Sequence, residues 1–311
     1  MNILHVKYAV EIAKTKSISK AAKNLYMGQP NLSRAIRELE ENLGITIFKR
    51  TSKGITVTPE GEEFLEYARR IVAQVEEVED MYKNGRKKTV RFSASVCRSS
   101  YIADAFTNFM KGLSDTDPAE IFYKETNSMK TISNIIKGDF DLGIVRYQST
   151  FDKYFTDLFA EKNFIHETVF EFSYNLLMSK DSPLADKTEV SLASLENYTE
   201  ITHADPYVPS MPIIDVKKAE LSGNIDRHIY VFERASQFTL LENVPNTFMW
   251  VSPIPPELIE KYHLVQKKCP DNQKKYKDVL IYRKGHNITE LENEFITQVC
   301  ESKRKLESIF D

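Results

Sequence analysis

Five polar side chains within one nine-residue segment, 29–37, could make hydrogen bonds to the edges of DNA bases. A glutamine can bridge adenine and an arginine can bridge guanine, which is how a base sequence is read in the major groove. Leu32, Ile36 and Leu39 recur among them at spacings of four and three, so one helix would carry apolar side chains inward and polar ones outward. The polar set consists of Gln29, Asn31, Ser33, Arg34 and Arg37.

The residues before this segment suit a helix-turn-helix. Residues 4–14 show the apolar spacing of a first helix, and Ser17 or Ser19 can cap a second one. Gly28 is expected in the turn, where its backbone can adopt a positive φ angle. Pro30 is tolerated in the first turn of the following helix, whose N–H groups lack partners in any case. This order of elements predicts a device that inserts its last helix into the major groove of DNA.

A basic hairpin is predicted next, because residues 45–50 and 55–58 alternate like two strands around a short turn. Lys49, Arg50 and Lys53 suit contacts with phosphates or with the minor groove. The alternative is that these charges only face solvent. The DNA-binding candidates are therefore Ser19, Gln29, Pro30, Asn31, Ser33, Arg34, Arg37, Lys49, Arg50 and Lys53.

Charge is unevenly distributed along the chain. Residues 1–60 contain ten Lys or Arg and five Asp or Glu, which gives them a net charge of +5. The whole chain carries −3, so the remaining residues carry −8. A basic head on an acidic body fits a protein that grips a polyanion at one end. Charge excesses of this size are common, so the helix-turn-helix motif is stronger evidence for DNA binding than the charge is.

Length and composition set the broad class. The 311 residues allow two or three domains, and the hydrophobic fraction is ordinary for a globular protein. No apolar run would span a bilayer, and Lys7 and Glu11 interrupt the N-terminal segment, so no signal peptide is expected. The cysteines Cys97, Cys269 and Cys300 are far apart and suit a reducing compartment. We therefore expect a cytoplasmic protein with no metal and no membrane partner.

A long helix is predicted after residue 59. Its apolar residues follow a heptad seam that would face a partner helix, although an amphipathic helix packed on its own domain would show a similar pattern. The seam consists of Phe64, Ala68, Ile71, Val75, Val78 and Tyr82. We expect a winged helix-turn-helix at 1–59, a linker and dimerisation helix with a hinge at 60–88, and an effector-binding domain at 89–311.

After residue 89, strands and helices alternate, which predicts an α/β region with mostly parallel strands. The sequence contains no nucleophile elbow, phosphate-binding loop, dinucleotide-binding fingerprint or zinc-protease motif. Its six histidines are scattered. We therefore predict no catalytic residues and no cofactor, and expect that the protein is not an enzyme.

Several ordered motifs resemble the LysR-type bacterial transcriptional regulators. They are SKAA at 19–22, QPNLSRAI at 29–36, LEENLG at 39–44, FKR at 48–50 and TPEG at 58–61. The phrase KGDFDLGIV at 137–145 extends the resemblance, more weakly, into the rest of the chain. The resemblance implies a C-terminal domain like the periplasmic binding proteins, with two α/β lobes around a ligand cleft. Lobe one would comprise about 89–164 and 270–305, and lobe two about 165–269.

The resemblance also implies partners. Members of this family bind double-stranded DNA and are typically tetramers, assembled as dimers of dimers through the long helix and the effector domains. RNA polymerase is a further candidate partner. A small-molecule effector would bind between the lobes, and the DNA-binding heads would respond to it.

In folds of this kind, ligands lie beyond the carboxyl ends of strands, where helix N-termini favour an anion. The effector-binding candidates are Arg98, Ser99, Ser100, Thr126, Asn127, Ser128, Thr202, His203, Arg234 and Ser236. A guanidinium such as that of Arg98 can hold a carboxylate through two parallel hydrogen bonds. We therefore expect a small organic anion such as a carboxylate. The competing interpretations are that the serines only cap helices and that Arg98 and Arg234 pair with carboxylates of the protein.

Two functions fit these observations. The favoured one is a sequence-specific transcriptional regulator that responds to a small molecule. The alternative is a constitutive DNA-binding or architectural protein whose α/β body serves only oligomerisation. An enzyme fused to a DNA-binding head would need a catalytic constellation that the sequence does not contain.

Overall fold

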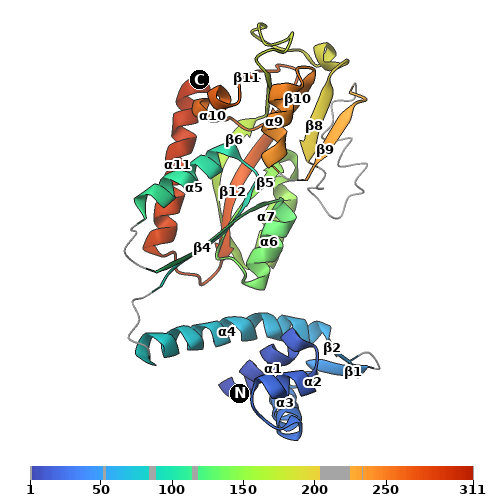
Figure 1. The fold of residues 1–311 in the computed structure, drawn as a ribbon, viewed down its shortest axis with the longest axis vertical. Helices are drawn as coiled ribbons and strands as arrows, with labels where there is room; N and C mark the ends of the chain where they lie inside the picture. The colour runs from blue at the N-terminus through green and yellow to red at the C-terminus, as the bar shows by residue number, and fades with distance from the viewer. Residues whose placement is uncertain are drawn as a thin grey trace. The chain divides into compact units, whose positions relative to one another are not determined.

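The computed structural model describes residues 2–51, 54–83, 89–113, 118–203, 225–232 and 234–310. The chain divides into two compact units, Met1–Thr89 and Val90–Asp311. The first is a helical head with a small hairpin, and the second contains two sheets flanked by helices (Figure 1). None of the helices in the described ranges is long and apolar enough to cross a membrane.

Three helices form the centre of the head: α1 (Ile3–Thr15), α2 (Ile18–Asn24) and α3 (Gln29–Leu43). Ser17 caps α2, because its side chain accepts a hydrogen bond from the backbone of the first helical turn at 3.3 Å. Gly44 ends α3 with a φ angle of 70°, as a C-cap glycine should. The core of the head consists of Val6, Ala9, Ile12, Ala21, Ala22, Leu32, Ile36, Leu39, Ile47, Leu65, Ala68 and Val72.

The turn between α2 and α3 differs from the prediction. Tyr26 adopts the positive φ angle, at 53°, whereas Gly28 has a φ angle of −71° and serves as the N-cap of α3. A hydrogen bond from the Met27 nitrogen to the Ala22 oxygen, at 3.0 Å, closes the turn. The Tyr26 side chain is 98% exposed, so the left-handed backbone meets no packing constraint there.

A hairpin wing follows, formed by β1 (Phe48–Thr51) and β2 (Gly54–Val57) in antiparallel register. Helix α4 (Pro59–Lys83) begins directly after it. The Thr58 hydroxyl donates to a carbonyl of the loop before β1 and accepts the Gly61 N–H at 2.9 Å. A β-carbon on Gly61 would lie 2.3 Å from another carbonyl oxygen of that loop, so only glycine lets α4 begin so close to the wing.

Part of the apolar surface of helix α4 packs against the core of the head. Its buried side chains are Leu65, Ala68 and Val72. Ala68 was predicted in the heptad seam, but it packs inside its own domain. Ile71 and Val75 are only half-buried, and Val78 is 52% exposed. The Tyr82 side chain lies outside the described residues. The helix therefore carries two apolar stripes, of which one is used within the head.

The first sheet of the second unit has the strand order β4-β3-β5-β12-β6. Its strands are β3 (Val90–Cys97), β4 (Ala119–Thr126), β5 (Leu142–Gln148), β6 (Phe164–Ser173) and β12 (Lys275–Arg283). Strand β3 runs parallel to β4 and β5, whereas β12 runs antiparallel to β5 and β6. The sheet is therefore mixed, and the expectation of mostly parallel strands was wrong for the side formed by β12 and β6.

Helices cover both faces of this sheet. Helices α5 (Ser100–Gly112) and α11 (Glu290–Phe310) pack on one face, and α6 (Ser128–Lys137) and α7 (Asp152–Glu161) on the other (Figure 1). A short 3₁₀ helix, Ser149–Phe151, precedes α7. We call this sheet and its four helices the first lobe.

The second sheet has the strand order β11-β7-β10-β8-β9. Its strands are β7 (Asn175–Ser179), β8 (Thr199–His203), β9 (His228–Val231), β10 (Thr247–Val251) and β11 (Leu264–Lys267). Helices α9 (Ala235–Asn243) and α10 (Pro256–Lys261) pack on one face through an apolar cluster, and the 3₁₀ helix Leu192–Leu195 joins the cluster on the other. We call this sheet and its helices the second lobe.

The passage between the lobes lies later in the chain than expected. Strand β6 pairs with β12 along Phe164–Ser173 and therefore belongs to the first lobe, although about 165 onward was predicted for the second. The chain enters the second sheet only with β7 at Asn175 and returns to the first with β12. Strand β6 was misplaced because hydrophobic alternation identifies a strand but not its pairing partner.

Candidate functional sites

Helix α3 presents the predicted base-reading residues to solvent. Ser33 is half-buried, and its neighbours on the polar face are exposed. The exposed members are Gln29, Pro30, Asn31, Arg34 and Arg37. Residues 31, 34 and 37 are spaced by three and so form one stripe along the helix. That stripe offers an amide and two guanidinium groups, which are the donors needed at base edges in a major groove.

Ser19 joins the second helix to the first residue of α3. Its hydroxyl donates a hydrogen bond to the Gln29 side-chain oxygen at 3.2 Å. Both residues are exposed, so the bond orients Gln29 rather than burying it. Ser19 was predicted as a DNA contact, and the structure shows in addition that it positions another candidate.

Glu40 links α3 to the wing. Its carboxylate accepts the backbone N–H groups of Ile47 at 2.7 Å and Phe48 at 3.0 Å. The start of β1 is thus tied to the recognition helix, and Lys49 in β1 is exposed. The Arg50 side chain and Lys53 lie outside the described residues.

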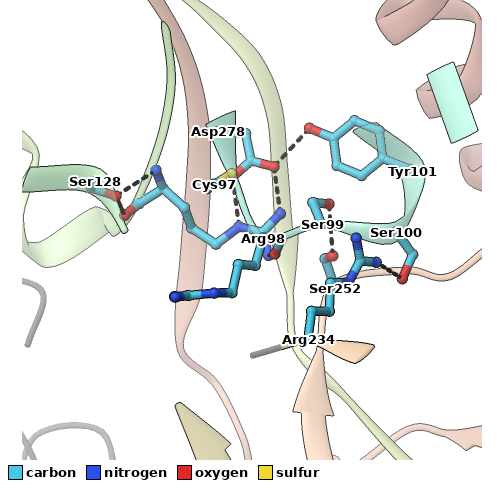
Figure 2. Close-up of polar contacts among 10 residues, drawn as sticks. Cys97, Arg98, Ser99, Ser100, Tyr101, Ser128, Arg234, Ser252 and Asp278 are labelled. Carbon is cyan, nitrogen blue, oxygen red and sulfur yellow. Dashed lines mark hydrogen bonds and ion pairs between the residues drawn. The ribbon is translucent and has the colours of Figure 1, made fainter. Parts of the chain in front are cut away.

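Four of the predicted effector residues meet where the two lobes join (Figure 2). Arg98 follows β3 and donates from Nη2 to the Phe232 carbonyl of the second lobe at 3.2 Å. The Ser99 hydroxyl lies 3.3 Å from the Ser252 hydroxyl, also of the second lobe. Ser100, the first residue of α5, accepts a hydrogen bond from Arg234 Nη2 at 2.7 Å.

Arg234 is also one half of an ion pair between the lobes. Its Nη1 lies 2.5 Å from Glu125 Oε1, and the two side chains are 15% and 22% exposed. Its guanidinium lies 5.8 Å from the centre of the Phe238 ring. The alternative in which an arginine of this region pairs with a carboxylate of the protein therefore holds for Arg234.

Two other candidates serve the backbone of the first lobe. Asn127 caps α6 by accepting the Lys130 N–H at 2.8 Å. The Ser128 hydroxyl accepts the Arg146 N–H at 2.9 Å, donates to the Arg146 carbonyl at 2.6 Å, and is fully buried. Thr126, which ends β4, is buried too. At this corner Asn127 caps α6, whereas Ser128 bonds the backbone of β5 and caps no helix.

The remaining candidates lie in the second lobe. Thr202 and His203 end strand β8 and are half-buried, while Ser236 is exposed in the first turn of α9. Residues 204–206, which were expected to continue the binding loop after His203, lie outside the described residues. The structure therefore gathers Arg98, Ser99, Ser100 and Arg234 in one place.

Beneath the junction lies a buried polar network that sequence reasoning missed. Arg146 makes two hydrogen bonds of 2.6 Å to the two oxygens of Asp278, and Tyr101 donates to the same carboxylate at 2.7 Å (Figure 2). Burial alone would lower the pKa of Arg146, but Asp278 raises it well above its usual value. Burial and the nearby Asp278 raise the pKa of the Cys97 thiol, so Cys97 stays protonated and unreactive.

This network had a signal in the sequence, but an incomplete one. Arg146 interrupts the apolar run 142–147, and Asp278 directly precedes the apolar run 279–282. A charge in a buried strand needs a partner. Because 132 residues separate the two, local pattern could not identify that partner. Glu125 and Ser252 were missed for the same reason.

Metal binding finds no support in the described part of the chain, where no three His, Cys, Asp or Glu side chains gather closely enough to hold an ion. Cys97 and Cys269 are buried free thiols.

Comparison with known proteins identifies the head. Residues 3–62 match the model of the bacterial regulatory helix-turn-helix proteins of the LysR family. The head belongs to the LysR family of bacterial regulatory helix-turn-helix proteins. This head is the DNA-binding module of bacterial transcriptional regulators.

Relatives extend the match beyond the head. The HTH-type transcriptional regulator AlsR of Bacillus subtilis is 22% identical over 99% of both chains. Full-length LysG of Corynebacterium glutamicum, solved with bound effector arginine, has a TM-score of 0.62 at 11% identity and covers 98% of this chain and 99% of its own. Full-length CbnR complexed with its target DNA has a TM-score of 0.54 at 18% identity and covers 97% of this chain and 100% of its own. These LysR-family structures share the fold of the winged head and the two-sheet domain.

Proposed function

We propose that this LysR-family regulator reads DNA with helix α3 and responds to a small organic anion at the junction of its lobes. One observation supports the anion most: Arg98 lies two residues before α5, and Arg234 of the other lobe bonds Ser100 at the N-terminus of α5. A helix N-terminus already favours negative charge, and a guanidinium can hold a carboxylate through two hydrogen bonds. Ser99 and Ser100 add hydroxyl groups to the same place.

The DNA contacts follow from the exposed stripe. Arg34 and Arg37 would reach guanine, and Gln29 and Asn31 would reach adenine or phosphate. Lys49, Arg50 and Lys53 of the wing would contact the backbone or the minor groove. The structure of CbnR with its target DNA supports a DNA complex for a chain of this fold.

The anion is tested by titrating the full-length chain in a calorimeter with small mono- and dicarboxylates and their neutral amides. A carboxylate should bind, its amide should not, and Arg98→Ala should weaken carboxylate binding by roughly tenfold or more, the loss expected for a charged hydrogen bond. Tight binding of uncharged compounds would refute the anion, as would carboxylate affinity that Arg98→Ala leaves unchanged.

The second candidate is a constitutive DNA-binding protein whose second unit only assembles the oligomer. A specific observation favours it: protein groups already bridge the junction, with Arg234 on Glu125 and Ser99 beside Ser252. If no compound of any charge class changes the DNA footprint or the melting temperature, this function is the better one.

We further propose that the regulator acts in the cytoplasm as a dimer of dimers, with RNA polymerase as its partner at promoters. The second apolar stripe of α4, formed by the half-buried Ile71 and Val75 and the exposed Val78, supports pairing of two chains through this helix. Placing Asp at both Ile71 and Val75 should split the dimer, because it puts unpaired charges into a dry interface. Sedimentation that shows an unaltered oligomer would mean that α4 pairs with no second chain.

A further inference from the structure

The junction contains an ion pair that joins the two lobes whichever of the functions above the protein has. Arg234, the N-cap of α9 in the second lobe, reaches into the first lobe and ends on Glu125 in β4 and Ser100 in α5. We propose that these three residues form an interlobe latch, which holds the two lobes together in the absence of any effector.

The Arg234 guanidinium is held in place by contacts on several sides. Its two terminal nitrogens bind two different residues of the first lobe, at 2.5 Å to Glu125 and 2.7 Å to Ser100. Hydrogen bonds between charged groups at these distances are the strong class, and both ionic side chains are mostly buried. Phe238, one turn along α9, lies against the guanidinium and limits its freedom.

The elements that carry the latch are rigid. Glu125 lies in a strand that pairs along its whole length with β3, and Ser100 begins a thirteen-residue helix. The sequence separation between Arg234 and Glu125 is 109 residues, so the contact joins lobes rather than neighbours in the chain. Breaking it would release the lobes from each other and leave each lobe intact.

Two further bonds cross the same junction. Arg98 of the first lobe donates to the Phe232 carbonyl of the second, so the segment that carries Arg234 is held at a second point. The hydroxyls of Ser99 and Ser252 meet in a buried position. The arginines therefore reach across in opposite directions, and the Glu125 pair supplies the ionic contact between the lobes that the latch depends on.

The test measures the distance between the lobes in the full-length chain without ligand. Spin labels are placed at Lys137→Cys in the first lobe and Glu257→Cys in the second, both exposed, with Cys300→Ser to remove the more accessible native thiol. Labelled chain is diluted into unlabelled chain so that only distances within one molecule are read. The latch predicts a single short distance population.

Arg234→Ala, Glu125→Ala and the milder Glu125→Gln should each raise the ratio of long to short distances by about tenfold or more. The charge exchange Glu125→Arg with Arg234→Glu should restore the short population. The matched control is Arg91→Ala, which removes an ion pair with Glu120 that lies wholly within the first lobe. It should leave the distances unchanged.

The latch is wrong if the three single variants keep the distances of the parent chain, if Arg91→Ala shifts them equally, or if the charge exchange fails to restore them. Should an alanine variant not fold, Glu125→Gln alone decides between these outcomes. The inference rests on the effector domain of the proposed function and shares Arg234 and Ser100 with its anion site, but it does not depend on an anion being bound. No ligand enters this experiment, so failure of the carboxylate titration and failure of the latch are separate results.

Discussion

The head and the two-lobed unit use their polar residues in opposite ways. On α3, Asn31, Arg34 and Arg37 face solvent, and the packing of the head depends on the apolar side opposite them. At the lobe junction, Arg146 and Arg234 are bound to carboxylates of the protein itself. The difference determines how readily each region can bind a partner. A face that packs nothing is available to a partner, whereas a satisfied group must be displaced before it can bind one.

This contrast predicts two classes of variant. Changes in the second unit should alter stability and leave DNA specificity alone, and changes on α3 should do the reverse. The contrast would be weakened if a variant in the second unit changed DNA specificity, or if a variant on α3 changed stability.

The largest effect is expected for Asp278→Asn. It leaves Arg146, whose side chain is 6% exposed, without its counter-charge, and a broken buried ion pair typically costs about 3–5 kcal/mol. Urea denaturation of the full chain should show a loss of this size. Glu120→Gln, at an ion pair whose side chains are more than half exposed, is the control and should cost less than about 1 kcal/mol. Equal losses for the two variants would contradict the buried network.

The next effect concerns Glu200, which lies buried in β8 with its Oε2 3.5 Å from His228 Nδ1. Burial raises the pKa of Glu200 from 4.5 to about 7. The folded chain then holds a proton that the unfolded chain releases near 4.5, so stability should fall as pH rises from about 4.5 to about 7 and then level off. The fall should be roughly 3 kcal/mol, from the size of that shift.

Glu200→Gln should abolish this pH dependence and make the protein more stable than the parent chain near neutral pH. Glu196→Gln, at an exposed position of the same lobe, should change neither. Denaturation midpoints at about pH 5 and about pH 8 suffice for the comparison. A parent chain whose stability is flat over this range would show that Glu200 ionises normally.

On the head, Arg34→Ala should weaken specific DNA binding by roughly 1–3 kcal/mol, the range for a bidentate contact to guanine. The melting temperature should not change, because Arg34 is exposed on a face that packs nothing. Titration of operator and scrambled duplexes at one salt concentration separates lost specificity from lost charge. An equal loss on both duplexes would reassign Arg34 to phosphate contact.

The smallest effect is expected for Ser19→Ala. It removes the hydrogen bond to Gln29, a contact worth about 0.5–1.5 kcal/mol at most, and should reduce operator affinity by up to that amount. Ser17→Ala is the informative companion, because Ser17 caps the same helix and should lower stability instead. If both serines changed only stability, Ser19 would have no part in reading DNA.

Local chemistry made the head predictable. The heptad-like spacing of Leu32, Ile36 and Leu39 and the C-cap Gly44 define α3 without reference to any other segment. The prediction failed in the turn before α3, where either of two residues could adopt the positive φ angle. Tyr26 adopts it, and Gly28 does not. That choice depends on which carbonyl Met27 reaches, which the sequence does not specify.

The lobe junction was predictable only in part. Arg98, Ser99, Ser100 and Arg234 were found because they lie at strand ends or helix starts, which are local features. Their partners Glu125 and Ser252 are remote in sequence and ordinary in type, so the sequence could suggest that Arg234 pairs with a carboxylate but could not identify which one. Ser128 bonds the backbone of Arg146, 18 residues away in β5, and a local pattern does not reveal that contact. Strand β6 was assigned to the wrong lobe since its partner β12 lies over a hundred residues later.

Selection from a randomised duplex library tests the central claim most directly, which is that the open polar face of α3 reads a base sequence. Full-length protein should enrich one sequence motif. The Gln29→Ala, Arg34→Ala double variant should still bind DNA through its remaining positive charge but should enrich nothing. A parent chain that retains DNA without enriching any motif, or a double variant that enriches the same motif equally well, would contradict the account.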